Sequence, residues 1–250
     1  MRILISNDDG INATGLERLE RVAQTLSDDV WVVAPETDQS GASHSLTLAT
    51  PVRLRRLSER RYAVAGTPSD SVLLAVLKVF DGERPDLVLS GINRGGNLGE
   101  DVIYSGTVAA AMEATLLGVP AIALSQDTAD RARTKWATAE HHAPGVIRRL
   151  LEVGWPSNVM MNVNFPDVPE DSVSGVRMTV QGRRKPGSAI DERVDPRGRP
   201  YYWISSARTE EATVPGSDLV AIADGAISVT PLFMDLTHHQ TCQSMQAVFS

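Results

Sequence analysis

Short apolar runs alternate with amphipathic stretches along the first two-thirds of the chain. The runs are bounded by turn residues, and their lengths are typical of buried strands. These candidate strands are Arg2–Ser6, Val30–Ala34, Leu87–Ser90 and Ala121–Ser125. The stretches between them carry apolar residues at helical spacing. The candidate helices are Gly15–Leu26, Ser69 (as N-cap) to Phe80, Thr107–Leu117 and Thr134–Leu151. Repetition of strand, helix and strand predicts an α/β fold with a parallel sheet, right-handed crossovers and flanking helices.

Two regions depart from this alternation. Apolar and polar residues alternate singly over Leu46–Gly66, which predicts antiparallel strands on the flank of the sheet. The chain is richer in proline, glycine and charge from Val168 to Pro231, where only short strands are expected. These are near Gly175–Gln181, Tyr201–Ser205 and Ala226–Thr230. We therefore expect one domain over residues 1–250, in which an α/β core (1–165) precedes an extended β-rich arm and C-terminal segment (166–250).

A basic run lies inside the second of these regions. Arg183, Arg184 and Lys185 stand directly before Pro186 and Gly187, residues that favour turns and loops. The favoured interpretation is a solvated loop or arm, and a contact with a ligand is the alternative.

Composition narrows the class of protein. The chain has 250 residues, of which 42% are hydrophobic, enough for a sizeable core. A formal net charge of -7 gives no support for binding a nucleic-acid polymer, although a local cation can still attract a small phosphorylated ligand. The one cysteine, Cys242, excludes an intrachain disulfide and agrees with a reducing compartment. The chain also lacks a signal-peptide pattern and an apolar run of membrane-spanning length, so we expect a cytoplasmic protein with no membrane partner.

The first candidate functional residues follow the first predicted strand. Asp8 and Asp9 follow the apolar run directly and precede Gly10. In open α/β sheets, ligands bind in the crevice outside the carboxyl ends of the strands. Adjacent carboxylates repel each other and are costly to desolvate, a cost that a hard divalent cation offsets. The plainer alternative is that the pair only opens a turn into the next helix.

Polar loops also follow the other strands. Ser40 lies after the second strand, and Asn93 and Asn97 lie in the glycine-rich loop after the third. Because parallel strands end at one edge of the sheet, these loops can converge on the aspartates. Asp8, Asp9, Ser40 and Asn93 together offer only oxygen ligands, which suit Mg²⁺ or Mn²⁺ and not zinc.

A helix start adds a candidate anion site. Ser105, Gly106 and Thr107 open a predicted helix, whose first backbone N–H groups are unpaired and can bind phosphate. An ordinary N-cap is the alternative interpretation of this tripeptide. Neither the GxGxxG pattern nor the P-loop pattern occurs, so dinucleotide binding and P-loop triphosphate chemistry are not supported.

These segments, taken together, resemble the SurE family, the survival protein E 5'/3'-nucleotidases. The matching segments of the first half are Ile3–Gly10, Val32–Pro35 with Gln39–Gly41, Ser90–Gly99 and Tyr104–Val108. The later ones are Gln181–Arg184, Tyr201–Trp203 and Ser228–Leu232, so the resemblance extends over nearly the whole chain.

The resemblance implies a metal-dependent phosphatase that acts on nucleoside monophosphates. It implies one divalent cation per subunit, Mg²⁺ or Mn²⁺, on the positions that match the family's ligands: Asp8, Asp9, Ser40 and Asn93. It further implies a Rossmann-like core and a homodimer or homotetramer in which a C-terminal segment, about Ala226–Ser250, exchanges between subunits. The preference for 5' or 3' phosphates and any activity on polyphosphate stay open.

The expected reaction is metal-assisted hydrolysis. Asp8 or Asp9 would orient or deprotonate the attacking water, and Asn97 with the Ser105–Thr107 helix start would hold the phosphate. His44 is a candidate for protonating the leaving oxygen, although a structural or surface role is more common for a histidine. An aspartyl-phosphate intermediate ranks lower, because both carboxylates are expected to hold the metal.

Two other functions use similar residues. A receiver-like signalling module binds Mg²⁺ at an acidic pair after its first strand, but the strand Leu87–Ser90 ends here without the aspartate that such a module phosphorylates. A nucleotide-sugar transferase would use carboxylates to hold a metal diphosphate. Release of inorganic phosphate from a monophosphate distinguishes the phosphatase from both.

Overall fold

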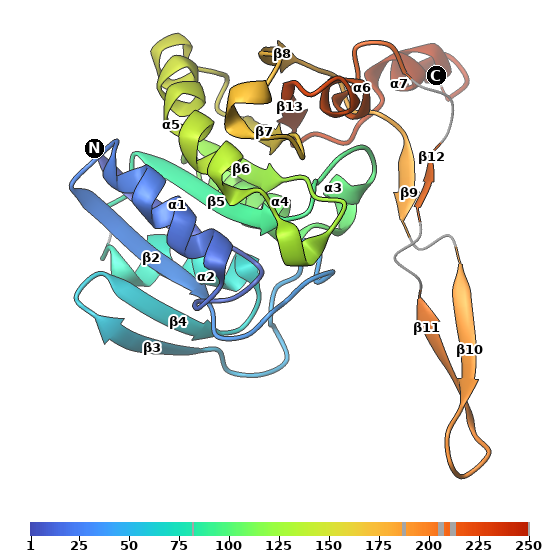
Figure 1. The fold of residues 1–250 in the computed structure, drawn as a ribbon, viewed down its shortest axis with the longest axis horizontal. Helices are drawn as coiled ribbons and strands as arrows, with labels where there is room; N and C mark the ends of the chain where they lie inside the picture. The colour runs from blue at the N-terminus through green and yellow to red at the C-terminus, as the bar shows by residue number, and fades with distance from the viewer. Residues whose placement is uncertain (82, 187–188, 205–207, 211–213, 250) are drawn as a thin grey trace.

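The computed structural model describes residues 1–81, 83–186, 189–204, 208–210 and 214–249. Its centre is a nine-stranded sheet in the order β3-β4-β2-β1-β5-β6-β7-β13-β8 (Figure 1). The strands of this sheet are β1 (Arg2–Ser6), β2 (Asp29–Pro35), β3 (Arg53–Ser58), β4 (Arg61–Ala65), β5 (Leu87–Arg94), β6 (Ala121–Gln126), β7 (Val159–Phe165), β8 (Val176–Met178) and β13 (Ile227–Phe233). Strands β2, β1, β5, β6 and β7 run parallel to one another, which confirms the predicted parallel core.

Helices cover both faces of this sheet. They are α1 (Thr14–Gln24), α2 (Pro68–Leu74), which continues as a π-helical turn over Ala75–Val79, α3 (Asp101–Tyr104), α4 (Gly106–Leu116), α5 (Trp136–Val153), α6 (Asp218–Ala223) and α7 (His239–Gln246). Short 3-10 turns lie at Arg131–Arg133 and Glu170–Ser172.

Strand β1 shows how the two layers form. Ile3 and Ile5 point to the side of α1 and α5, and Leu4 points to the side of α2 and α4. All three side chains are fully buried, because successive residues of a strand face opposite sides of a sheet that is covered on both. This explains why the sequences of the central strands are continuous apolar runs and do not alternate between apolar and polar residues.

The helix that was expected to start at Ser69 starts earlier. Thr67 is its N-cap: the Thr67 hydroxyl accepts the Asp70 N–H at 3.1 Å, and Asp70 accepts the Thr67 N–H at 2.9 Å. This reciprocal pair is a capping box, with Pro68 as the first helical residue. The expectation of Ser69 as N-cap was wrong because it overlooked the threonine before the proline.

The flanks agree with the alternating pattern. β3 and β4 pair antiparallel, as the pattern over Leu46–Gly66 predicts, and β4 continues the sheet by pairing parallel with β2. At the opposite end, β13 pairs antiparallel with β7. The sequence analysis did not assign β7 to a strand, although it is buried almost along its whole length.

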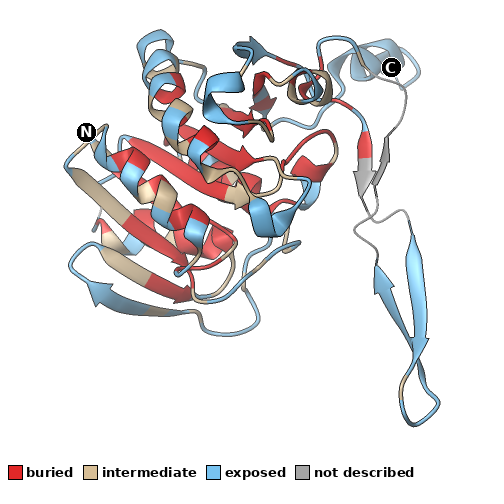
Figure 2. Ribbon diagram, viewed as in Figure 1, coloured by how far each residue is buried: buried red, intermediate tan, exposed pale blue. Residues whose placement is uncertain are grey.

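An arm projects from the body of the molecule. It consists of β9 (Arg184–Pro186) paired with β12 (Arg208–Glu210), followed outward by the hairpin of β10 (Ile190–Val194) and β11 (Pro200–Ile204) (Figure 1). The hairpin is exposed along both strands, in contrast to the central sheet (Figure 2). Gly187 and Ser205, which the sequence analysis placed in a loop and a strand, lie outside the described residues.

The basic run at the root of the arm is not uniformly solvated. Arg183 is exposed, but Arg184 is buried and forms an ion pair with Asp101 of α3. The expectation of a solvated loop was therefore wrong for Arg184. Sequence reasoning missed its partner because the two residues are 83 positions apart.

The chain beyond β13 lies largely on the surface. Leu236, Val248 and Phe249 are 95%, 72% and 85% exposed. Leu232, inside β13, is buried. Within the described part of the chain, none of the helices combines the length and the apolar character that crossing a bilayer requires.

Candidate active site

Three polar loops meet at the carboxyl edge of the parallel strands. The strand order places β1 between β2 and β5, so the residues at and just after the ends of these strands become neighbours. Asn93, which was expected in the loop after the third strand, lies within β5, because this strand continues to Arg94. They enclose a cavity of about 410 Å³. The lining residues that sequence analysis had singled out are Asp8, Ser40, Asn93, Asn97 and Ser105. The expected convergence of the loops is confirmed for these five side chains.

Asp8 is the most deeply placed of the candidate ligands. It is 5% exposed, and its Oδ1 accepts a hydrogen bond of 2.5 Å from the Thr107 hydroxyl. Burial raises the pKa of the Asp8 carboxyl from its ordinary value of 3.8 to about 6, and the Thr107 hydrogen bond opposes the rise. A buried carboxylate of this kind is poorly solvated when charged, and a cation would stabilise it.

Asp9 lies next to Asp8 but is not among the residues that line the larger cavity. It lines a neighbouring pocket of about 280 Å³, which shares Arg94 and Arg131 with the larger cavity. Burial raises the pKa of Asp9, while the backbone N–H of Arg94 and the positive charges of Arg131 and Arg94 lower it. The two arginine side chains therefore favour the charged form of the Asp9 carboxylate.

Ser40 and Asn93 contribute neutral oxygens. Asn93 donates its amide N–H to the Gly95 carbonyl at 2.8 Å, an arrangement that uses the amide nitrogen and leaves its carbonyl oxygen to accept other contacts. The Ser40 hydroxyl donates to Asp38 Oδ1 at 2.6 Å, which keeps the serine oxygen as an acceptor. The Gln39 N–H donates to the Asp8 backbone carbonyl at 2.8 Å and ties this loop to β1.

The donor set fits a hard divalent cation. Among the described residues, no three acidic, histidine or cysteine side chains gather closely enough to hold a metal alone. A cation here would depend on the two aspartates supplemented by the oxygens of Ser40 and Asn93. Two carboxylates with neutral oxygens are a typical protein contribution to a magnesium site, which keeps several waters.

The start of α4 approaches Asp8 more closely than expected. A Cβ atom on Gly106 would lie 2.6 Å from the Asp8 Cβ, so only glycine permits this packing. Ser105 is the N-cap of α4: its hydroxyl accepts the Val108 N–H at 3.1 Å, and the residue also lines the cavity. The ordinary N-cap interpretation of Ser105 is thus confirmed, and phosphate binding by it stays a prediction.

Thr107 lies elsewhere than its expected role requires. It is fully buried, does not line the cavity, and donates its hydroxyl proton to Asp8. In this arrangement Thr107 orients a carboxylate and does not reach a phosphate in the cavity.

Asn97 is fixed by hydrogen bonds to buried polar residues of β6 and β7. Its side-chain N–H donates to the Ser125 hydroxyl at 2.8 Å, and its backbone N–H donates to Asn164 Oδ1 at 2.8 Å. The Asn162 and Asn164 amides both donate to its carbonyl oxygen. The asparagines of β7 therefore fix a residue of the cavity wall, a role that the sequence analysis missed.

His44 lies apart from the cavity wall. Its Nε2 is 2.8 Å from Oε2 of Glu113, a buried residue near the middle of α4, and His44 is not among the lining residues. This geometry supports the structural alternative for His44 more than a contact with a leaving group.

Charged residues that the sequence analysis left out also belong to the site. Arg94 ends β5, and its guanidinium lies 5.7 Å from the centre of the Trp136 ring. Arg131 lies on the 3-10 turn after β6 and borders both pockets. Asp127 lines the larger cavity as well. The signal that could have found Arg131 is its position in the loop after the fourth predicted strand, which ends at the same sheet edge.

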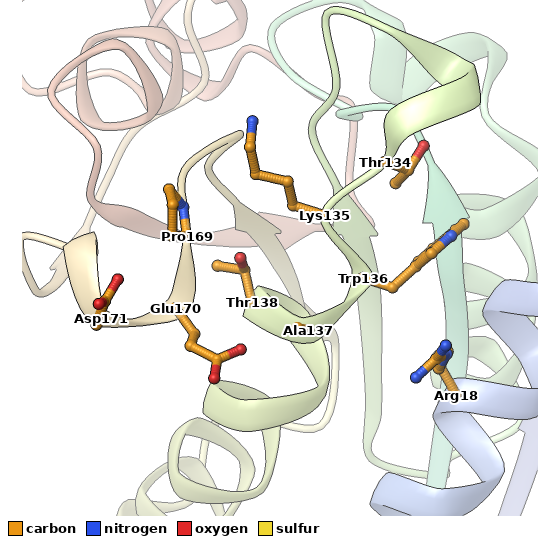
Figure 3. Close-up of a pocket in the computed structure, with 9 residues that line it drawn as sticks. All are labelled: Arg18, Thr134, Lys135, Trp136, Ala137, Thr138, Pro169, Glu170 and Asp171. Atoms are coloured by element: carbon orange, nitrogen blue, oxygen red, sulfur yellow. The ribbon is translucent and has the colours of Figure 1, made fainter.

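A wider depression lies beside this site. Figure 3 shows its lining residues, which come from α1 (Arg18), the start of α5 and the segment Pro169–Asp171. The volume of this depression is about 610 Å³. Both of its basic side chains are already paired, Arg18 with Glu140 and Lys135 with Asp167, and its other charged side chains, Glu170 and Asp171, are acidic. The Thr138 hydroxyl likewise donates to the Val168 carbonyl. The oxygen-rich cavity at Asp8 is therefore the better candidate for chemistry.

Comparison with known proteins agrees with this geometry. The family profile described as "Survival protein SurE" matches residues 3–188, most of the chain and every candidate ligand. The chain belongs to the SurE family. The 5'-nucleotidase SurE of Paramagnetospirillum magneticum is 62% identical over 249 residues, covering 100% of this chain and 96% of that protein. The 5'-nucleotidase SurE of Caulobacter vibrioides is 54% identical over 252 residues, covering 99% and 96%.

The SurE fold is supported by a solved structure. The crystal structure of the SurE protein from Aquifex aeolicus superposes with a TM-score of 0.86 at 37% sequence identity, and the match covers 100% of both chains. The α/β fold class and the family expected from the sequence are thereby confirmed. The match includes the arm and the C-terminal segment.

Proposed function

We propose that this protein is a metal-dependent 5'-nucleotidase, which hydrolyses nucleoside monophosphates to nucleoside and inorganic phosphate. The observation that carries the proposal is the position of Asp8 in the wall of an oxygen-lined cavity, in a SurE chain whose relatives described above bear the name 5'-nucleotidase SurE. Activity on 3' phosphates and on polyphosphate extends the proposal, because the contacts proposed below would hold the phosphoryl group and would not depend on its position on the sugar.

The metal site is proposed at Asp8, Asp9, Ser40 and Asn93, with Mg²⁺ or Mn²⁺ as the cation. A bound cation of this type would withdraw charge from a phosphoryl oxygen and acidify a water molecule. The residues themselves support this arrangement, since all four side chains offer oxygen. Asp8, Ser40 and Asn93 line the same cavity, and Asp9 lines the neighbouring pocket.

The chain's own residues would perform the remaining tasks. Asp8 or Asp9 would orient the attacking water and accept its proton. Ser105 and Asn97, which line the cavity, would donate hydrogen bonds to the phosphoryl oxygens. Arg94 and Arg131 would offset the negative charge that a phosphate brings to a site already containing two aspartates.

Phosphate release tests this proposal. The purified protein is incubated with a panel of 5' and 3' mononucleotides and a short polyphosphate, with Mg²⁺, Mn²⁺, Zn²⁺ or chelator. Release from 5' mononucleotides in Mg²⁺ or Mn²⁺ supports the proposal. Absence of release under every metal condition, in a protein shown to be folded, would refute it.

A homo-oligomer with an exchanged C-terminal segment is the second part of the proposal. Leu236, Val248 and Phe249 would leave water if this segment docked on another copy of the chain. Burial contributes roughly 25 cal/mol per Å² before the costs of association. Such a dimer or tetramer would function in the cytoplasm, in agreement with the lone, exposed Cys242.

Truncation after Met234 tests the assembly, because it keeps β13 and the buried Leu232 in place. Light scattering is expected to show a loss of oligomers relative to the full chain. An unchanged oligomer in the folded, truncated protein would contradict exchange of this segment.

A further inference from the structure

Arg184, at the root of the arm, is buried against the loop of residues 95–101, part of which lines the candidate site. The side chains of Arg184 and Asp101 are 8% and 7% exposed. The guanidinium donates to the Asp101 carboxylate and, at 3.4 Å, to the Gly96 carbonyl. The Arg184 backbone N–H also donates to the Glu100 carboxylate. One arm residue therefore contacts both ends of this loop.

Asp218 provides a second link between the loop and the arm. This fully buried residue accepts the Gly99 N–H at 2.9 Å and the Gly182 N–H at 2.8 Å. A Cβ atom on Gly182 would lie 2.8 Å from Asp218 Oδ1, so a side chain here would displace the Asp218 carboxylate. Asp218 thus holds the chain just before Arg184 alongside the loop.

The core holds the same loop from its other side. Asn97 is bonded to Ser125, Asn162 and Asn164, as described above. The loop is therefore held between β7 and the root of the arm. Gly96, Asn97 and Asp101 line the cavity, whereas Arg184 does not. Any effect of Arg184 on the site must pass through these residues.

We propose that Arg184 is a positioning residue that fixes the 95–101 loop, and with it Asn97, at the geometry the reaction requires. This inference rests on the proposed function only for its kinetic part. Removal of Arg184 takes a counter-charge from the buried Asp101 carboxylate and a donor from the Gly96 carbonyl, so the loop loses two of the contacts that fix it. Displacement of a catalytic group by about 1 Å costs about 100-fold in rate.

Arg184→Lys is the first test, because lysine keeps the charge but its side chain is one atom shorter and ends before the position of Nη2, the nitrogen that donates to both Asp101 and Gly96. We expect kcat to fall about 10- to 100-fold. We expect the affinity for Mn²⁺, measured by titration, to stay within about 2-fold, since Asp8, Asp9 and Ser40 lie on other loops and Asn93 lies within β5, before the loop. Amide hydrogen exchange is expected to accelerate at Asn97 and Gly99, whose N–H groups are bonded in the parent protein.

Arg177→Met is the matched control. Arg177 forms a 2.6 Å ion pair with Asp224 in the same C-terminal half of the chain, but both side chains are about half exposed and neither lines the cavity. We expect its kcat and loop exchange to equal those of the parent protein.

The paired replacement Arg184→Met with Asp101→Leu separates positioning from charge burial. Replacing both members of a buried pair by apolar groups often preserves stability. We expect thermal stability near the parent value and loop exchange that stays fast, because no group then holds the Gly96 carbonyl. Return of slow exchange in this double variant would overturn the proposal.

Two further outcomes would overturn it. One is parental kcat and loop exchange in Arg184→Lys, and the other is a loss of Mn²⁺ affinity as large as the loss of kcat. If the parent protein itself releases no phosphate, the proposed function fails, but the exchange measurements still test the positioning of the loop.

Discussion

The Thr107 hydroxyl lies 2.5 Å from Asp8 Oδ1, so the first turn of α4 is bonded to the carboxylate that follows β1. The two residues are 99 positions apart, and both are buried. Gly106 makes the contact possible, since any side chain there would collide with Asp8. Thr107 therefore serves the candidate metal site by holding one of its aspartates in place.

Thr107→Val is expected to weaken Mn²⁺ binding and lower kcat/KM, because the Asp8 carboxylate loses its partner while the volume of the side chain is kept. A hydrogen bond to a charged group contributes roughly 1.5–3 kcal/mol, so the loss is about tenfold to somewhat over a hundredfold. Thr107→Ser, which keeps the hydroxyl, should retain most activity. Thr115→Val serves as the control, because it removes another buried hydroxyl of α4, one that donates to the Ala111 carbonyl of the same helix. Equal kinetics in Thr107→Val and the parent protein would contradict this role.

Removal of divalent cations is expected to abolish turnover. Asp8, Asp9, Ser40 and Asn93 are oxygen donors, so Mg²⁺ or Mn²⁺ should restore activity after dialysis against chelator, and Zn²⁺ should restore less. Phosphate release from a 5' mononucleotide, measured before and after each addition, checks the prediction. Full turnover in protein that elemental analysis shows to be metal-free would contradict it.

Asp8→Asn is expected to stabilise the metal-free protein at neutral pH. Because the folded-state pKa of Asp8 is raised to about 6, the fold favours the protonated carboxyl. Stability from this group is present below the unfolded pKa near 3.8 and is lost as pH rises through 6. Asparagine carries no such charge, so the free energy of unfolding of the variant should exceed that of the parent protein by about 3 kcal/mol at pH 8 and by little at pH 4.

Urea unfolding in chelator, repeated between pH 4 and pH 8, measures this difference. Saturating Mg²⁺ is expected to reverse it, because the cation stabilises the parent protein and binds the variant weakly. A stability difference that does not change with pH would show that burial of the Asp8 charge is not its cause.

Arg131→Met is expected to raise KM for a mononucleotide, because the arginine borders both pockets and would lie near the substrate phosphate. Loss of one charge-assisted contact predicts a fall in kcat/KM of about tenfold or more. Arg133→Met is the control on the same turn, since Arg133 is 88% exposed and faces Asp130. If both variants behave alike in steady-state kinetics, Arg131 has no specific role.

The sequence by itself determined the core of this fold and the location of its candidate chemistry. Apolar runs such as Arg2–Ser6 predict buried strands because side-chain periodicity is a local property. Parallel strands share one carboxyl edge, so the convergence of Asp8, Ser40 and Asn93 also follows from the order of the elements. The SurE family could be identified from short segments for the same reason, since their residues are contiguous.

Tertiary structure decided what each polar side chain touches. Thr107 bonds Asp8, His44 pairs with Glu113, Arg184 pairs with Asp101, and the asparagines of β7 hold Asn97. Each of these contacts joins residues more than 60 positions apart. Local pattern carries no signal for such contacts, because they arise only when packing removes water and leaves each buried polar group to find its partner among whatever side chains the fold places beside it.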